Sequence, residues 1–421
     1  MKNIVFMCDT YLPKASPNGI CVEAVANNLF KKGYKVSVIT TPNIDGQLKM
    51  ENINGIDVYR INPGFVVNEL NAVDGKNDNK SLKRKKRALM ISKINGALNA
   101  FKYPLSAPVQ IKNYLKCIQK LEKNRHIDVV VCCYHKIAAV AAGIKFKKKN
   151  PNTKFIVYTL DAISGGLIFP VLNSRNIALK SLKRWEKRIF SMVDKAFVME
   201  SHRKHYDNVE YDNIRSKLEY LDIPLLKIER LTKECHDSKT IHFVYTGSMS
   251  DSTANPKYFI EILKNIKEDV VFDIYGNIDK NVMNVINNNN GDNKISIKGK
   301  VPYNQIDNIQ KEADILLNFG NANPCMIPCK IFEYISTGKK IISFTYSELD
   351  SSLPYLKKYP NVLIIDENND IDENISKIEE FINSPLKDID EEILSSLYKK
   401  NIPDYFYNQI NKLLEDSQWR F

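Results

Sequence analysis

Hydrophobic residues in the first half of the chain form short, nearly continuous runs, separated by segments with helical periodicity. The runs are "NIVFMC" (3–8), "KVSVIT" (35–40), "IDVYRI" (56–61), "IDVVVCC" (127–133), "KFIVYTL" (154–160) and "KAFVM" (195–199). Short apolar runs of this kind are typical of strands that are buried on both faces. Because helical segments separate several of these strands, the pattern predicts a parallel sheet covered by helices on both sides.

A second series of such runs follows a polar break around "LDIPLLKIERLTKECHDSKT". Its runs are "IHFVYT" (241–246), "VVFDIY" (270–275), "ISIKG" (295–299), "DILLN" (314–318), "KIISFT" (340–345) and "VLIID" (362–366). The chain has 421 residues, and single cores stop growing at roughly 250 to 300 residues. We therefore expect an α/β protein with two doubly wound Rossmann-like domains. The domains are predicted at 1–225 and 226–400, and a C-terminal helix at about 401–421 can pack back on the first.

Sheets of this kind bind ligands at the carboxyl ends of their strands, so the cleft between the two domains is the expected site. The stretch 329–344, "CKIFEYISTGKKIISF", predicts a short helix that ends at Gly338 and continues into a strand. Pro328 suits its first turn. Free N–H groups at its amino end, from Cys325 through Met326 to Lys330, form a natural seat for a diphosphate.

Glu333 lies about one turn into this predicted helix, among Ile331, Phe332, Tyr334 and Ile335. A carboxylate there can accept hydrogen bonds from a ribose placed over the helix. The alternative is that Glu333 belongs to the solvated edge of an amphipathic helix.

Several motifs resemble those of bacterial glycosyltransferases with two Rossmann-like domains (the GT-B fold), most closely the retaining family 4. In chain order they are "SPNGICVEAVANNLFKKGYKVSVIT", "FVYTGSMSD", "FDIYGN", "ISIKGKVPYNQIDNIQKEADILLN" and "PCKIFEYISTGKKII". The last is similar to the "P-S-K-x-F-E-Y" variant of the family's Glu-x7-Glu motif. The resemblance covers the whole chain and implies a UDP- or GDP-linked sugar as donor substrate, with no further cofactor. It also implies that the second domain binds the donor and the first the acceptor.

The resemblance assigns roles to individual residues of the second domain. Glu333 takes the place of the family's second Glu, which binds the nucleotide ribose. Cys325 stands where the first Glu is expected, which leaves sugar selectivity and retention of configuration open. Ser248, after Gly247, replaces the family's phosphate-binding Arg, and Lys330 can supply that charge instead.

Two further positions follow from the same resemblance. The loop "GKVP", which contains Val301, resembles the family's segment whose backbone recognises the base of the nucleotide. Gly19 resembles the loop glycine that lets the amino-terminal backbone approach the donor phosphate, which a residue without a Cβ permits at low cost.

Two residues of the first domain lie just after the ends of predicted strands and are therefore candidates for catalysis. His135 can contact the donor phosphate or sugar, and Asp161 can orient or deprotonate an acceptor hydroxyl. The alternatives are that Asp161 caps the turn "DAISGG" and that His135 is structural. His202 and His205, in "ESHRKHY", have no visible acidic partner and are expected to be solvated.

Composition narrows the class of protein. The eight cysteines follow no disulfide or zinc spacing, which favours a reducing compartment. The amino terminus has only six apolar positions in a run before Asp9, fewer than a signal peptide needs, and no stretch approaches the roughly 18 apolar residues of a membrane span. We expect a cytoplasmic protein, attached to a membrane at most peripherally, at its inner face.

The "DID" triplets at 370–372 and 388–390 could indicate a metal-dependent transferase, but both lie in acidic segments after the last strand, so no metal site is predicted.

The net charge of +12 is localised, because residues 80–125 contain 13 Lys or Arg and 1 acid. The core of this segment is basic and then apolar. Residues 80–98 are therefore predicted to contact an anionic membrane surface or a lipid-phosphate acceptor, with a solvated basic helix as the alternative. This basic core has no aromatic residues between its Lys and Arg residues, on which the bases of a single-stranded nucleic acid could stack. This argues against nucleic-acid binding.

Together the resemblance and the basic segment imply a metal-independent glycosyltransferase of bacterial surface polysaccharide synthesis that uses a glycan or lipid-linked acceptor. Retention of configuration is what the resemblance implies, and Cys325 in place of the first Glu leaves it open. The rival interpretations are a degenerate nucleotide-sugar-binding protein without turnover, suggested by Cys325, and a basic nucleic-acid-binding protein.

Overall fold

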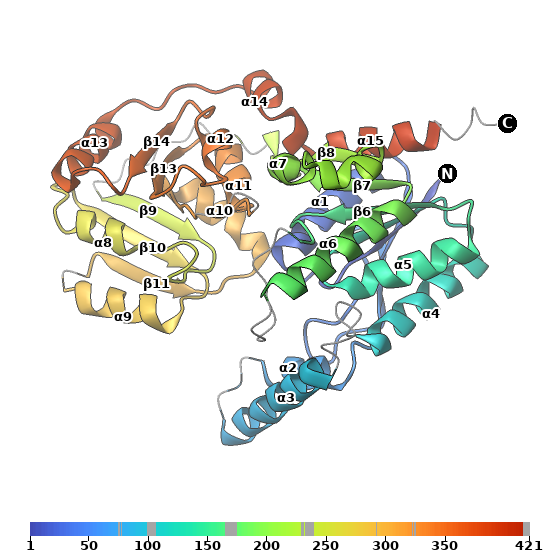
Figure 1. Cartoon of the computed structure of the whole chain (residues 1–421). Helices are drawn as coiled ribbons and strands as arrows, with labels where there is room; N and C mark the ends of the chain where they lie inside the picture. Colours follow the sequence, from blue (N-terminus) through green and yellow to red (C-terminus); the bar gives the residue numbers. More distant parts are fainter. Residues whose placement is uncertain are drawn as a thin grey trace. The chain divides into compact units, whose positions relative to one another are not determined.

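The computed structural model describes residues 1–74, 76, 78–98, 107–164, 175–228, 231, 240–291, 293–321, 323 and 326–415. The chain forms two compact units, Met1–Pro224 with the chain from Pro403 onward, and Leu225–Ile402. Each unit has a mainly parallel sheet with helices on both faces (Figure 1). The predicted class, α/β with two Rossmann-like domains, is confirmed.

The first unit is built on an eight-stranded sheet with the order β3-β4-β2-β1-β5-β6-β7-β8. Its strands are β1 (Asn3–Met7), β2 (Lys35–Thr40), β3 (Met50–Ile53), β4 (Ile56–Arg60), β5 (Val129–Tyr134), β6 (Lys154–Thr159), β7 (Lys195–Met199) and β8 (Leu218–Leu221). Its helices are α1 (Pro17–Lys31), α2 (Phe65–Val73), α3 (Asn79–Leu98), α4 (Pro108–Asn124), α5 (Ile137–Lys149), α6 (Arg175–Met192), α7 (Arg203–Tyr206) and α15 (Pro403–Glu415), with 3-10 turns η2 (Glu200–His202) and η3 (Val209–Lys217).

All twelve predicted strands are present, and their ends differ from the predicted ends by two residues or fewer. The sequence pattern missed the two edge strands, β3 and β8. The sheet is parallel as predicted except at this edge, where β3 pairs antiparallel with β4. An edge strand buries little side-chain surface, and "MENI" alternates exposed and half-buried positions, so it carries no continuous apolar run.

Helices cover both faces of this sheet. Helices α4 and α5 pack side by side on one face (Figure 1) and share an apolar core with Val5, Val157 and Val198. On the other face, the Phe406 ring of α15 contacts the rings of Tyr158 and Phe197 at centroid distances of 5.3 and 5.2 Å. Because side chains alternate along each strand, adjacent residues of β6 and β7 pack against the helices on opposite faces of the sheet.

The second unit has a six-stranded sheet with the order β11-β10-β9-β12-β13-β14, and its printed pairings are parallel. Its strands are β9 (Ile241–Thr246), β10 (Val270–Tyr275), β11 (Ile295–Gly299), β12 (Ile315–Phe319), β13 (Lys340–Thr345) and β14 (Val362–Asp366). Its helices are α8 (Lys257–Leu263), α9 (Lys280–Asn289), α10 (Tyr303–Glu312), α11 (Lys330–Thr337), α12 (Leu353–Leu356), α13 (Ile371–Asn383) and α14 (Glu391–Leu397), followed by the 3-10 turn η5 (Lys399–Asn401).

A cluster of aromatic rings anchors α8 to this sheet. Phe259 of α8 contacts Phe243, Phe272 and Phe344 at centroid distances of 5.2 to 5.3 Å. The order of the sheet places β9 next to both β10 and β12 at its centre. The loops that leave β9 and β10 therefore lie next to each other at the carboxyl edge of the sheet.

Candidate active site

Glu333 is buried in the second unit, where only 8% of its surface is exposed. Tyr303 donates a hydrogen bond of 2.8 Å to Glu333 Oε1, and the Gln310 amide donates one of 3.3 Å to Oε2. Both donors belong to α10, two turns apart, and therefore lie on one face of that helix. The alternative of a solvated edge residue is wrong, because the carboxylate is held between two helices.

The same two helices are tied to the end of β9. The backbone N–H of Thr246 donates to the Tyr334 hydroxyl at 2.9 Å, and Gln310 donates to the Thr246 hydroxyl, also at 2.9 Å. Glu333 is therefore fixed close to the point where the chain leaves β9. Neither Tyr303 nor Gln310 was predicted, because their link to Glu333 is a tertiary contact.

Lys330 is the first residue of α11, three positions before Glu333. Its ammonium nitrogen lies 3.7 Å from the centroid of the Tyr245 ring and donates a hydrogen bond to the Tyr245 hydroxyl. That hydroxyl donates in turn to the carbonyl oxygen of Ser248 at 2.8 Å. Removal from water lowers the pKa of Lys330 to about 7, although the neighbouring Glu333 acts in the opposite direction. An arriving phosphate would favour the charged form of this amine.

Glycines end the central strands next to Lys330. Gly247 and Gly276, after β9 and β10, have φ values of 147° and 149°. A Cβ on Gly276 would lie 1.8 Å from the carbonyl oxygen of Gly247, and a Cβ on Gly247 would lie 3.2 Å from the Lys330 nitrogen. Only glycine fits at Gly276, and the edge of the sheet presents bare backbone here.

Ser248 and Val301 lie on neighbouring loops. Ser248 is exposed directly after Gly247, and Val301 is half-buried between the end of β11 and the start of α10. Their predicted contacts with the donor phosphate and the base stay predictions.

We expected the backbone N–H groups at the amino end of α11 to be free, and this holds only for some of them. The N–H of Met326 is used, since it donates to Asn323 at 3.1 Å. The N–H groups of Cys329 and Lys330 have no protein partner within the described part of the chain. Pro328 precedes the helix instead of opening it, and Cys325 lies outside the described residues.

In the first unit, charged residues gather where β1, β5 and β6 end. His135 is exposed and Asp161 half-buried, and His135 lies close enough to Asp161 to counteract the rise in the pKa of that carboxyl that burial causes. Asp9, two residues after the end of β1, is buried, and desolvation raises its pKa while Lys136 and His135 oppose the shift. The structure thus brings together the two predicted residues and adds Asp9 and Lys136.

Asp9 was missed, although it follows its strand just as Asp161 does. Its Oδ2 atom is buried and has no hydrogen-bond partner among the described residues. A signal was present, because the first apolar run is followed at once by a carboxylate. Its position predicts the same strand-end placement.

Gly19 was expected in the loop before α1, but it lies in the first turn of that helix. A Cβ at this position would come within 2.5 Å of the carbonyl oxygen of Thr10. The close approach is therefore to the chain's own backbone, and a role beside a donor phosphate stays a prediction.

The expectation that His202 and His205 are solvated is wrong. His202 is fully buried, and His205 Nε2 lies 3.3 Å from a carboxylate oxygen of Glu186. The acidic partner was missed because it lies on α6, 19 residues earlier in the sequence.

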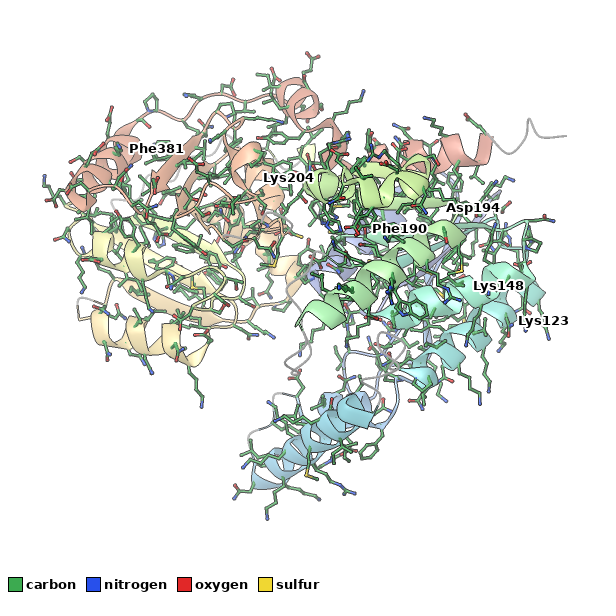
Figure 2. All side chains as sticks on the ribbon, in the orientation of Figure 1. Lys123, Lys148, Phe190, Asp194, Lys204 and Phe381 are labelled. Carbon is green, nitrogen blue, oxygen red and sulfur yellow. The ribbon has the colours of Figure 1, made fainter. Side chains whose placement is uncertain are left out.

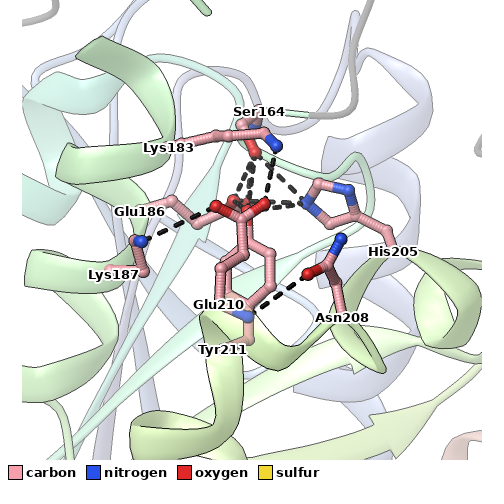
Figure 3. A network of polar contacts seen from close by, with 8 residues as sticks. All are labelled: Ser164, Lys183, Glu186, Lys187, His205, Asn208, Glu210 and Tyr211. Carbon is pink, nitrogen blue, oxygen red and sulfur yellow. Dashed lines mark hydrogen bonds and ion pairs between the residues drawn. The ribbon is translucent and has the colours of Figure 1, made fainter. Parts of the chain in front are cut away.

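Glu186 is the centre of a buried polar network (Figure 3). Tyr206 and Tyr211 donate hydrogen bonds of 2.9 and 2.7 Å to its carboxylate, and the Ser164 hydroxyl donates a third. Burial alone would raise the pKa of Glu186, but His205, Ser164 and Tyr211 hold it below its ordinary value. Because Ser164 lies three residues after Asp161, the network ties this segment to α6.

The acidic "DID" triplets serve as helix caps. Asp370 accepts hydrogen bonds from the N–H groups of Asp372 and Glu373, and Asp390 accepts one from Ile393. In the described ranges, no three His, Cys, Asp or Glu side chains are grouped to hold a metal ion. Nor does any helix there combine the length and apolar character that crossing a membrane requires.

No protein-family model and no curated protein sequence matches the chain, but solved structures match nearly all of it. Sucrose-phosphate synthase from Thermosynechococcus elongatus is 10% identical with a TM-score of 0.67, over 99% of this chain and 100% of that one. HepE from Anabaena, in complex with UDP and glucose, is 11% identical with a TM-score of 0.65, over 99% and 100% of the two chains. The UDP-forming α,α-trehalose-phosphate synthase from Burkholderia xenovorans, in complex with glucose-6-phosphate, is 10% identical with a TM-score of 0.63, over 98% and 100%. At such identities the similarity establishes the fold, which is GT-B.

Proposed function

We propose that this protein is a metal-independent glycosyltransferase of bacterial surface polysaccharide synthesis, related to the retaining family 4. It moves a sugar from a nucleotide-sugar donor, most simply UDP-linked, to a glycan or lipid-linked acceptor at the cytoplasmic side of the membrane. The observation that carries the proposal is the placement of Lys330 and Glu333 at the start of α11, beside the glycines that end β9 and β10.

The second unit supplies the donor chemistry in this proposal. A carboxylate has about four acceptor positions, so Glu333 can hold ribose hydroxyls in addition to Tyr303 and Gln310. Negative charge grows on the diphosphate as the bond to the sugar breaks. Lys330 and the N–H groups at the start of α11 stabilise that charge in the transition state.

The first unit supplies the acceptor chemistry. Burial raises the pKa of Asp161, which makes its carboxylate a better proton acceptor for an acceptor hydroxyl than an ordinary Asp. His135 is exposed beside it and can contact the donor phosphate or sugar.

Glu333→Gln tests the donor site. We expect donor affinity to fall about 10- to 100-fold, because a hydrogen bond to a charged group contributes about 1.5 to 3 kcal/mol. The donor is first identified by a thermal-shift screen of UDP- and GDP-sugars, and its affinity is then measured by calorimetry.

Glu380→Gln, an exposed position on α13 of the same unit, is the matched control and should bind like the wild type. Equal affinity in wild type and Glu333→Gln would refute the assignment. Sugar transfer or hydrolysis by the purified protein separates the transferase from a binding protein without turnover.

Helix α3 supports the membrane part of the proposal. It packs against α2 through Ala88, and Arg84 forms an ion pair of 2.9 Å with Glu69 of α2 (Figure 1). Its other side exposes Leu89, Met90 and Ile94 by 45, 57 and 50%. Exposed apolar residues next to a run of Lys and Arg are typical of a helix that lies in the interface of an anionic membrane.

The variant Lys83→Gln/Lys85→Gln/Lys86→Gln/Arg87→Gln keeps Arg84, which holds α3 on α2. Each basic residue near an anionic leaflet contributes about 1 kcal/mol, so partitioning onto anionic vesicles at low salt should fall roughly 10²- to 10³-fold. Vesicle sedimentation measures it. The control removes the same charge from the exposed positions Lys145, Lys148, Lys149 and Lys204 of the first unit (Figure 2 labels Lys148 and Lys204). A wild type that stays in the supernatant at low salt would leave α3 as a solvated helix.

A further inference from the structure

The first unit contains a cavity of about 680 Å³ that is distinct from the strand-end residues described above. Its walls are the loop 42–49 after β2, the segment 60–63 at the end of β4, and side chains of α2 and α4. Neither His135 nor Asp161 lines it. Its volume lies within the range of small-molecule sites.

Hydrogen bonds between side-chain amides and the backbone fix the walls. The Asn71 amide of α2 donates to the carbonyl oxygen of Pro42 at 2.8 Å. The Asn113 amide of α4 donates to the carbonyl oxygen of Asn62, also at 2.8 Å. The loops are therefore tied to the helices, and the amide groups are set in place for hydroxyl groups of a ligand.

The cavity is strongly basic. Its charged lining residues are Lys49, Arg60, Lys116 and Lys120, with Asp45 as the acid. Lys49, Lys116 and Lys120 are exposed, and none of them has an ion pair within the described part of the chain. Lys116 and Lys120 are four residues apart on α4, where like charges repel each other and destabilise a helix. An anionic ligand removes this repulsion.

Arg60 is buried, and its contacts hold the walls of the cavity together. Its guanidinium donates to the carbonyl oxygens of Leu48 and Leu12 at 3.3 and 2.9 Å and pairs with Glu51. The lysines are therefore the cations left for a ligand. None of the described residues that line the cavity is aromatic, so it offers no ring on which a nucleotide base could stack.

We propose that this cavity binds the phosphate-bearing sugar headgroup of the acceptor, with the phosphate at Lys116 and Lys120 and the sugar hydroxyls at the amides. Only the role of this ligand as acceptor rests on the proposed glycosyl transfer. Helix α2 lines the cavity and also packs against α3, so a headgroup in the cavity would lie on the helix pair that meets the membrane in that proposal.

Calorimetric titration of the full chain with glucose 1-phosphate and with glucose, in the absence of donor, tests the site. We expect glucose 1-phosphate to bind at least tenfold more tightly than glucose, and Lys116→Gln/Lys120→Gln to remove that preference. Lys145→Gln/Lys148→Gln, which removes two exposed charges from α5, should behave like the wild type (Figure 2 labels Lys148). Equal binding of the two sugars, or an unchanged preference in Lys116→Gln/Lys120→Gln, would overturn the proposal.

Two further measurements separate the sources of the ligand and the two proposals. Displacement of glucose 1-phosphate by vesicles that contain phosphatidylglycerol assigns the headgroup to a lipid, and binding unaffected by vesicles assigns it to a soluble sugar phosphate. Lys330→Met, which removes the phosphate-binding charge proposed for the donor site, should keep the glucose 1-phosphate affinity, whereas loss of it would move the site to the second unit and refute the cavity. A wild type that binds this sugar through Lys116 and Lys120 but binds no nucleotide sugar would refute the transferase and leave the cavity standing.

Discussion

Replacing Lys330 by methionine is expected to lower the rate of sugar transfer about 10²- to 10³-fold, the loss typical for removal of one group that stabilises developing negative charge. In the proposed reaction that charge develops on the diphosphate at the start of α11, where the Lys330 nitrogen lies over the Tyr245 ring. Methionine fills a similar volume, and the Glu333 carboxylate keeps its hydrogen bonds from Tyr303 and Gln310 in the variant. The fold should therefore survive.

Single-turnover kinetics at saturating donor measure this loss, and a thermal melt confirms folding. Lys357→Met changes an exposed lysine of the same unit and should keep the wild-type rate. A Lys330→Met protein with an unchanged rate would remove Lys330 from the reaction.

The pKa of Lys330 gives the same residue a second readout. Since it is lowered to about 7, the amine is mostly neutral in the free protein at about pH 8.5. The diphosphate favours the charged form, so binding takes up a proton, and donor affinity should rise as the pH falls toward 7 and level off below it. Calorimetry in buffers with different ionisation heats should show uptake of about one proton by the wild type and none by Lys330→Met.

The sequence predicted the centre of each sheet well, because buried parallel strands must be apolar along their whole length. Strands β1 and β13 illustrate this, since every residue in them is buried. The edge strand β3 has no such requirement and was missed, together with its antiparallel direction. Helix α11 was predicted with its C-terminal Gly338, whose φ of 76° requires a residue that tolerates the left-handed region.

The candidate site was predictable only where local position carries information. Glu333 and Lys330 belong to one helix, and Asp161 directly follows the apolar run 154–160, so each could be placed from neighbouring residues. The contacts of Tyr303 with Glu333 and of His205 with Glu186 join helices that the chain brings together only on folding. Their residues carry no local sign of those partners.

Replacing Glu186 by alanine is expected to cost about 3 to 5 kcal/mol of stability, the usual loss when one member of a buried charged network is removed. The carboxylate is fully buried and accepts hydrogen bonds from Ser164 and Tyr211 (Figure 3) and from Tyr206. Without it these donors are left unpaired, and the segment that carries Asp161 loses its link to α6. At about 2 to 4 °C per kcal/mol for a unit of this size, the melting temperature should fall by about 6 to 20 °C.

Glu210, in the same network view, provides the matched control. It is partly exposed and pairs with Lys183 at 2.6 Å, so Glu210→Ala should cost no more than about 1 kcal/mol. A Glu186→Ala protein as stable as Glu210→Ala would show that the buried carboxylate contributes little.

The difference between wild type and Glu186→Ala should also depend on pH. The pKa of Glu186 is lower in the folded protein than in the unfolded chain, so its ionisation stabilises the fold above the unfolded value, about 4.3. That contribution is lost as the pH falls through the lower, folded value. Melting curves of both proteins from neutral to acidic pH should therefore converge at the acidic end. A gap that stays constant would show that Glu186 acts through its shape and packing and not through its charge.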